Sequence, residues 1–120
     1  MDGKGFELEV AKVLLSKGYI VRHVGGSGDE GVDLVVKHDG KRIIVQCKAF
    51  RNYVNAGIVR EVYGTLIHQK ADEAWVVVAS GFYGGAKAFA SGKPIRLITA
   101  QQLKNLPPAN NAPEQCKGEK

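Results

Sequence analysis

Cysteine is scarce in this chain of 120 residues, which contains only Cys47 and Cys116. Two cysteines so far apart do not form the disulfide framework of a small secreted domain, so we expect a reducing compartment. Neither cysteine has a histidine at the close spacing of a structural zinc site, which argues against that class. Cys47 lies in an apolar, strand-like run, where a thiol packs as a small hydrophobic group rather than acting as a nucleophile.

Long hydrophobic runs are also absent. No segment approaches the ~20 apolar residues that span a membrane, and the first residues lack the apolar core of a secretory signal. We therefore expect a cytoplasmic protein without membrane attachment. The glycine-rich segment 25–28 is not followed by the Gly-Lys-Ser or Gly-Lys-Thr of a nucleotide-binding loop, which argues against that kind of site.

Positive charge is in excess. Lys and Arg number 17 against 12 Asp and Glu, a net charge of +5, and 44% of the residues are hydrophobic, as in a globular domain. The last fourteen positions, 107–120, contain two Lys and two Glu that cancel, so the whole excess belongs to residues 1–106. A basic domain favours a polyanionic partner, nucleic acid first, although a scattered cationic surface would give the same count.

The most informative stretch runs from Asp33 to Lys48. Two strand-like segments flank Asp39-Gly40, a dipeptide typical of a tight hairpin turn. Side chains alternate along a strand, so Gln46 and Lys48 point to one face, and folding the hairpin brings Asp33 near them. A carboxylate and an amide oxygen can bind a hard cation such as Mg²⁺, and an ammonium beside them can orient water or stabilise charge on a phosphate.

This arrangement resembles the PD-(D/E)XK nuclease motif, and locally the Mrr branch of restriction endonuclease-like proteins. The matching segments are Gly-Asp-Glu-Gly-Val-Asp at 28–33 and Val-Gln-Cys-Lys at 45–48. The resemblance implies a deoxyribonuclease that hydrolyses phosphodiester bonds with Mg²⁺, for which Mn²⁺ can substitute. It implies catalytic roles for Asp33, Gln46 and Lys48, and adds the backbone carbonyl of Cys47 as a metal ligand. Gln46 departs from the commoner Glu or Asp and removes one negative charge from the metal site.

An acidic residue on the first predicted helix joins this set. Residues 3–17 have helical spacing of apolar side chains, and Glu7 falls inside the apolar arc. A Glu in the first helical turn can simply turn toward water and favour the helix dipole. Nucleases of the resembled group carry an acidic residue eleven positions before a Gly-aromatic pair, and Glu7 has this spacing to Gly18-Tyr19. We therefore count Glu7 among the catalytic candidates.

Further residues are candidates for contact with DNA. Arg51, Asn52 and Tyr53 directly follow the strand that carries Lys48, where a phosphate can be gripped, although a polar connection to the next helix explains them equally well. Ser27 lies in the glycine-rich segment ahead of Asp33. Lys87 opens a short predicted helix, and its alternative interpretation is a solvated lysine.

The predicted order of elements is helix, three strands, helix, strand, helix, strand, helix. This order indicates an α/β fold with a mixed central sheet of about five strands flanked by helices, the restriction endonuclease-like core that the resemblance implies for about residues 5–106. Pro107-Pro108 ends regular structure, so we expect a nuclease domain over 1–106 and a flexible polar tail over 107–120.

Two alternatives stay open from sequence alone. A DNA-binding module can keep this fold without the chemistry, and a Holliday-junction-resolvase-like nuclease would prefer branched DNA. The sequence shows no target-recognition domain, so neither a DNA sequence nor a methylation preference follows. A homodimer, or a second polypeptide, could supply specificity and let both strands be cut.

Overall fold

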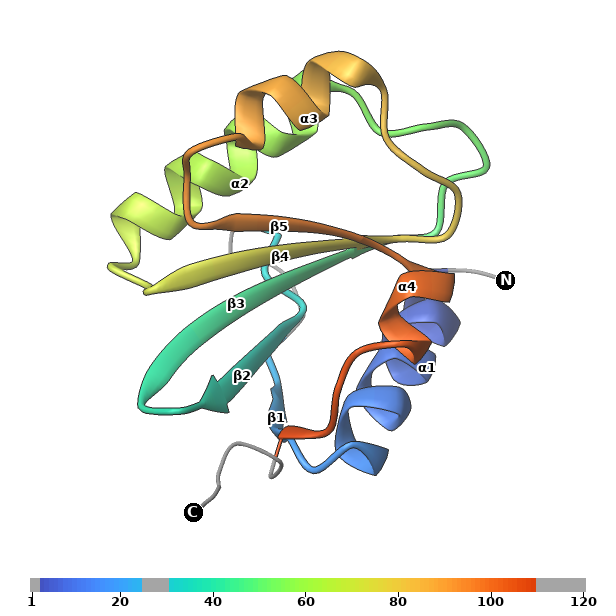
Figure 1. Ribbon diagram of the computed structural model, residues 1–120, viewed down its shortest axis with the longest axis vertical. Coiled ribbons are helices and arrows are strands. Elements are labelled where there is room, and N and C mark those ends of the chain that lie inside the picture. The colour runs from blue at the N-terminus through green and yellow to red at the C-terminus, as the bar shows by residue number, and fades with distance from the viewer. Residues whose placement is uncertain (1–2, 25–30, 110–120) are drawn as a thin grey trace.

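The computed structural model describes residues 3–24 and 31–109. Its elements follow the predicted order: α1 (Gly3–Ser16), β1 (Ile20–His23), β2 (Leu34–His38), β3 (Lys41–Lys48), α2 (Ala56–His68), β4 (Glu73–Val78), α3 (Gly84–Ala90), β5 (Ile95–Thr99) and α4 (Ala100–Lys104). Helices and strands form layers, with α2 and α3 on one side of the sheet and α1 and α4 on the other (Figure 1). None of the helices in the described segments is both long and apolar enough to cross a membrane.

The sheet has five strands in the order β1-β2-β3-β4-β5. The pairs β1–β2 and β2–β3 are antiparallel, whereas β3–β4 and β4–β5 are parallel. The sheet is therefore mixed, and the predicted fold class is confirmed. The parallel pairs exist because α2 and α3 carry the chain back over the same face before β4 and β5 begin.

The β2–β3 hairpin turns at Asp39-Gly40, as predicted. Both residues have positive φ, 59° and 78°. Turns with two positive φ angles match the twist of a two-residue hairpin, and Asp-Gly is a favoured pair for them. The turn sets the register that pairs Leu34 with Val45, and so fixes which part of β3 lies beside the start of β2.

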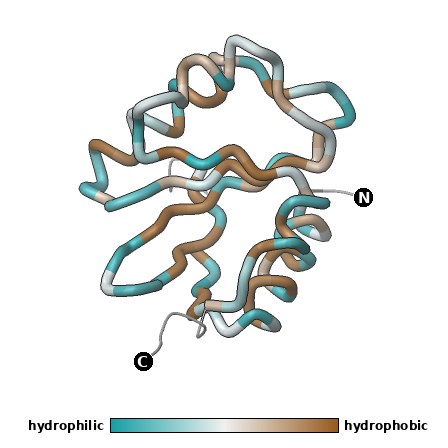
Figure 2. The backbone as a smooth tube through the Cα atoms, viewed as in Figure 1, coloured by the Kyte–Doolittle hydropathy of each residue, from teal (hydrophilic) through white to brown (hydrophobic). Residues whose placement is uncertain are grey.

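Two hydrophobic cores lie on the two faces of the sheet. Ile43 and Val45 of β3 belong to the core under α1 and α4, whereas Ile44 belongs to the core under α2 and α3. The central strand β4 is buried on both faces, from Ala74 through Val78, as its continuous apolar run predicts. Figure 2 shows hydrophobic residues concentrated along the strands and hydrophilic ones at the β2–β3 turn.

The chain continues to pack against the domain for a few residues after α4. Helix α4 begins with a capping box between Thr99 and Gln102 and ends at Lys104, but the chain remains packed after Pro107. The Tyr19 hydroxyl donates to the Pro107 carbonyl at 3.3 Å, and the Ala109 N–H donates to the Lys17 carbonyl at 2.8 Å. Ala109 is only 8% exposed. Residues 107–109, where the predicted tail begins, are therefore packed against the chain near Lys17 and Tyr19, and residues 110–120 lie outside the described part.

Candidate active site

Asp33 is fixed by backbone hydrogen bonds at the start of β2. Its N–H donates to the Val45 carbonyl at 2.9 Å, and its carbonyl accepts from the Val24 N–H at 3.0 Å. Its carboxylate Oδ2 accepts from the Cys47 N–H at 2.7 Å. The chain is thus tied to both neighbouring strands, and the carboxylate is held at the backbone of β3 between Gln46 and Lys48.

Glu7 meets this carboxylate from α1. Its side chain is 19% exposed and lies close enough to the side chain of Asp33 for the two groups to interact. Burial raises the pKa of Glu7, and the negative charge of Asp33 raises it further. Glu7 on the apolar side of α1 therefore faces a second carboxylate, and not only water.

His23 lies beside Glu7, although its sequence context predicts a surface residue at a strand end and makes it only a weak catalytic candidate. Its Nε2 lies 3.7 Å from Oε1 of Glu7, with 45% of the side chain exposed. A positive charge on His23 lowers the pKa of Glu7, opposing the effect of Asp33. His23 comes close to the site because it pairs with Leu34, the residue after Asp33. Only the order of the strands in the sheet could have predicted this pairing.

Gln46 lies on the face of the sheet that α2 covers. It lines a small cavity with Val62 and Thr65 of α2, next to Gly31. A Cβ atom at Gly31 would lie 2.6 Å from Nε2 of Gln46, and Gly31 has a φ of +83°. The positive φ favours glycine at position 31, and a side chain there would also displace the amide of Gln46.

Lys48 ends β3. Its ammonium lies over the Phe50 ring, 5.3 Å from the centroid, and its carbonyl accepts from the Ala79 N–H at 3.1 Å. The alternation predicted for β3 agrees with the packing, since Ile43, Val45 and Cys47 all contact the α1 core. Gln46 and Lys48 alternate with these residues along β3, so their side chains point to the opposite face of the strand. The Asp33 carboxylate accepts a hydrogen bond from the backbone N–H of Cys47, between them.

The Cys47 thiol is not available for nucleophilic chemistry. Burial raises its pKa strongly, and the charges of Asp33 and Glu7 add to this effect. A neutral thiol in contact with the α1 core behaves as a hydrophobic side chain. The packing predicted for Cys47 is confirmed. Cys116 lies outside the described residues.

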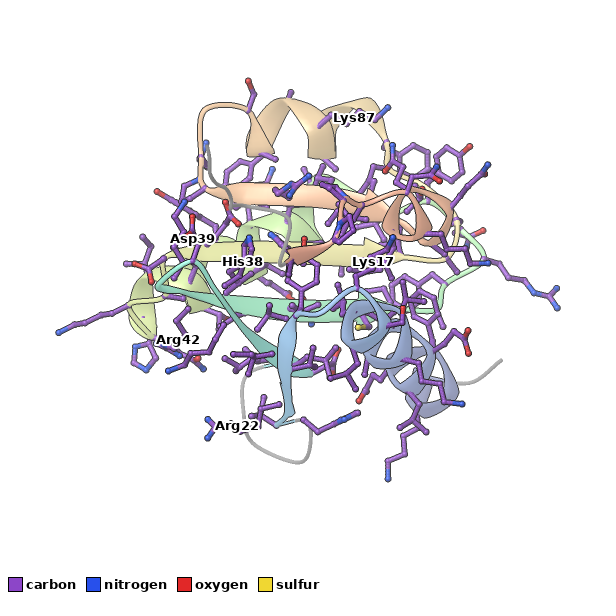
Figure 3. All side chains as sticks on the ribbon, turned by 60° about the horizontal axis from the view of Figure 1, so that its bottom comes forward. Lys17, Arg22, His38, Asp39, Arg42 and Lys87 are labelled. Atoms are coloured by element: carbon purple, nitrogen blue, oxygen red, sulfur yellow. The ribbon has the colours of Figure 1, made fainter. Side chains whose placement is uncertain are left out.

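The expected DNA contacts fall into one region. Arg51, Asn52 and Tyr53 are exposed in the loop after β3, and Lys87 projects from α3 (Figure 3). Tyr53 and Lys87 line one pocket of about 370 Å³, and Arg51 lines a neighbouring one with Phe50 and Ser80. Ser27 lies outside the described residues, as do Asp29 and Glu30 of the motif.

Acidic, histidine and cysteine side chains are the usual protein ligands of a divalent cation. Within residues 3–24 and 31–109, no group of three or more of these side chains is arranged to hold a metal ion. The described acidic pair is Glu7 with Asp33, and the other oxygen donors close to it are neutral. A metal site here would therefore combine the Asp33 carboxylate with neutral amide or carbonyl oxygens, with the Glu7 carboxylate beside it.

Comparisons with known proteins agree with this geometry. A family model for the Mrr catalytic domain, described as a restriction endonuclease, matches residues 1–106. The type IV methyl-directed restriction enzyme EcoKMrr of Escherichia coli K12 is 34% identical over 110 residues, covering 84% of this chain and 36% of that protein. The chain thus spans about a third of this curated relative.

Two solved structures share the fold. The MspJI restriction endonuclease, in complex with a 27-mer oligonucleotide, has a TM-score of 0.59 at 22% identity, covering 82% of this chain and 26% of that one. A repair endonuclease from Pyrococcus abyssi has a TM-score of 0.63 at 14% identity, covering 90% and 48%. With the family match over nearly the whole described chain, the protein belongs to the Mrr-type restriction endonuclease family and has its PD-(D/E)XK nuclease fold.

Proposed function

We propose that this chain is the catalytic domain of a divalent-metal-dependent endodeoxyribonuclease of restriction type. One observation carries the proposal: in a chain of this family, the Glu7–Asp33 carboxylate pair is held at the β3 backbone that bears Gln46 and Lys48. Hydrolysis of a phosphodiester needs a cation site, a positioned water and a group that stabilises charge on the phosphate. The residues around Asp33 are of the types that supply all three.

The donor set fits a hard cation. Burial raises the pKa of Glu7, and the negative charge of Asp33 beside it raises that pKa further, because two neighbouring carboxylates repel each other. A divalent cation would relieve this repulsion. Asp33 and Gln46 would hold the ion through side-chain oxygens, with the Cys47 carbonyl as a further ligand, and Mg²⁺ or Mn²⁺ suits such oxygen donors. When bound, the cation supplies Lewis-acid polarisation of the phosphate and activates water near neutral pH.

The chain's own residues perform the remaining tasks. The Lys48 ammonium orients the attacking water or stabilises the negative charge that develops on the phosphate. The Glu7 carboxylate, once deprotonated, accepts a hydrogen bond from water at the site and helps to orient it. The contact with Cys47 N–H keeps the Asp33 carboxylate fixed, so little reorganisation is needed when DNA arrives.

DNA is the proposed partner. The net charge of +5 favours a polyanion, and MspJI, which shares the fold, has been solved with an oligonucleotide. Since the chain spans only about a third of EcoKMrr, target choice in a whole protein would come from further sequence or from a partner. A homodimer would place two sites so that both strands are cut. We expect this activity in the cytoplasm.

The test is incubation of supercoiled plasmid with the protein in Mg²⁺, in Mn²⁺ and in EDTA. We expect nicked and linear products only with a metal. Lys48→Ala should lower the cleavage rate by about 10²–10³ and leave DNA binding and folding intact, because one charge-stabilising group is lost. Lys70→Ala, in the turn after α2, is the matched control and should cleave at the parent rate.

Three results would contradict the proposal or narrow it. Tight DNA binding without cleavage in any metal would identify a binding module that has kept the fold alone. Cleavage of four-way DNA in strong preference to plasmid or linear duplex would indicate a junction-resolving nuclease instead. Unchanged turnover in Lys48→Ala would remove that residue from the site.

A further inference from the structure

Among the residues that the structure describes, three aromatic side chains are strongly exposed, and all lie in two loops at one end of the sheet. Phe50 is 45% exposed, and Tyr53 and Tyr83 are each 54% exposed. The loop 49–55 follows β3 and the loop 79–83 follows β4. The other large apolar residues with comparable exposure, Leu8, Leu15, Ile20 and Ile67, are aliphatic and lie on α1, β1 and α2. We call Phe50, Tyr53 and Tyr83 the aromatic platform.

The backbone joins the two loops next to the tyrosines of the platform. A parallel β-bridge joins Val54 to Phe82, both buried. The Val54 N–H donates to the Gly81 carbonyl at 2.9 Å, and the Tyr83 N–H donates to the Val54 carbonyl at 3.0 Å. The two loops therefore behave as one unit, which places each tyrosine next to a buried anchor.

The tyrosine rings are packed closely and still leave surface exposed. Their centroids lie 5.5 Å apart at 57°. Tyr53 packs directly on Gly81, where an added Cβ would lie 3.2 Å from the ring carbons. Packing of this kind fixes ring orientation without burying the rings. Exposed aromatic surface held in one orientation indicates a binding surface rather than a core.

The chemistry around the platform is cationic. The Lys48 ammonium lies over Phe50, Arg51 follows Phe50 in the sequence, and Lys87 lines the pocket of about 370 Å³ beside Tyr53. Neither segment 49–55 nor 79–87 contains an Asp or a Glu. Aromatic faces interleaved with cations and free of acidic residues suit a nucleic acid strand, since phosphates pair with the cations while bases stack on the rings.

We propose that the aromatic platform binds unpaired nucleotides of a DNA strand, next to the phosphodiester at Lys48. This inference rests on the proposed nuclease function and adds a substrate class to it. Bases in an intact duplex present only their edges, whereas a ring can stack only on a base whose face is free. Substrates with single-stranded segments, such as frayed ends, gaps or forks, therefore engage the platform, and continuous duplex does not.

The experiment measures binding without cleavage. Fluorescence anisotropy in EDTA compares the full chain on three probes: a short oligothymidylate, an abasic strand of the same length and charge, and a duplex of that length. We expect the oligothymidylate to bind more tightly than the abasic strand. Tyr53→Leu with Tyr83→Leu should weaken oligothymidylate binding roughly 5- to 100-fold and abasic binding little. The corresponding Phe double variant, which keeps both rings, should bind like the parent.

The control is Ile67→Ala, which removes an equally exposed apolar side chain on α2 and should change nothing. Equal affinity of the parent for the oligothymidylate and the abasic strand would overturn the inference, as would full binding by the Leu double variant. If that variant fails to fold by circular dichroism, the comparison of the two strands on the parent protein still decides. Failure of metal-dependent plasmid cleavage would contradict the proposed function and leave this binding result unaffected.

Discussion

The contact between Glu7 and Asp33 is the residue-scale feature with the clearest consequences for pH. Because burial and the neighbouring charge raise the pKa of Glu7 above its ordinary value of 4.5, the folded chain binds this proton more tightly than the unfolded chain does. Protonation therefore favours the fold. The contribution is present below the ordinary value, and it is lost as pH rises from there through the raised pKa.

The first prediction follows from that sign. In EDTA, Glu7→Gln should raise the unfolding temperature near neutral pH, because the amide cannot carry the charge that Asp33 repels. The gain should shrink as pH falls toward about 4. The Mg²⁺ affinity of the parent should rise as pH increases over this range, because Glu7 loses its proton. The Glu7→Gln variant should bind the metal weakly. Glu9→Gln, on the exposed side of α1, is the matched control. A Glu7→Gln profile parallel to that of the parent would rule out this coupling.

Gln46 carries the second prediction. As a neutral ligand it should hold Mg²⁺ more weakly than a carboxylate would, since hard cations bind more tightly as ligand charge rises. Gln46→Glu should therefore lower the Mg²⁺ concentration for half-saturation, and Gln46→Leu should raise it sharply. Turnover need not increase in Gln46→Glu, because the new charge can draw Lys48 into an ion pair. Isothermal titration measures the affinities, and three indistinguishable values would remove Gln46 from the site.

At the scale of elements, the β2–β3 hairpin was predictable because its signals are local. Asp39-Gly40 specifies the turn, and strict alternation in β3 specifies which side chains enter the α1 core. The Asp33 contact with the β3 backbone follows from that register. The position of Glu7 was predictable only in part: helical spacing puts it on the apolar arc, but the partner depends on how α1 crosses the sheet.

Other element contacts leave little trace in the sequence. His23 reaches Glu7 because β1 pairs with β2, and a strand order is not encoded in any short pattern. Gln46 approaches Gly31 because Gly31 has a positive φ. Glycines near many turns can adopt a positive φ, so the sequence does not predict this contact. The aromatic platform depends on a single bridge between two distant loops. The packing of Ala109 was missed because one small residue in a polar segment gives no periodic signal.

The third prediction concerns that C-terminal packing. A chain ending at Ala109 should be as stable as the full chain if 110–120 add nothing to the core. A chain ending at Pro107 loses the Ala109 hydrogen bond to Lys17 and the burial of Ala109. We expect it to be less stable by about 1 kcal/mol. Urea denaturation of the three chains measures this, and equal midpoints for all three would mean that 108–109 contribute nothing.

At the scale of the whole molecule, charge is spread unevenly with respect to the site. Lys87 on α3 and Arg22 on β1 lie on opposite sides of the molecule (Figure 3). Lys87 shares its pocket with Tyr53, and Arg51 lies two residues earlier in the loop after β3. If DNA crosses the end of the sheet at Lys48, Arg51 and Lys87 neutralise its phosphates directly. Arg22 then contributes only to the overall electrostatic potential of the protein.

The last prediction uses salt to distinguish these groups. Each phosphate that a cation neutralises releases counterions, so the logarithm of duplex affinity should fall linearly with the logarithm of salt, with a slope of about −0.9 per contact. Arg51→Ala with Lys87→Ala should flatten the slope by about 1.8 if each cation neutralises one phosphate. Arg22→Ala removes one positive charge from the opposite side and should lower affinity slightly at low salt with the slope unchanged. An affinity that stays flat with salt would contradict electrostatic DNA binding altogether. Equal slopes for the Arg51/Lys87 variant and the parent would place the DNA elsewhere on the molecule.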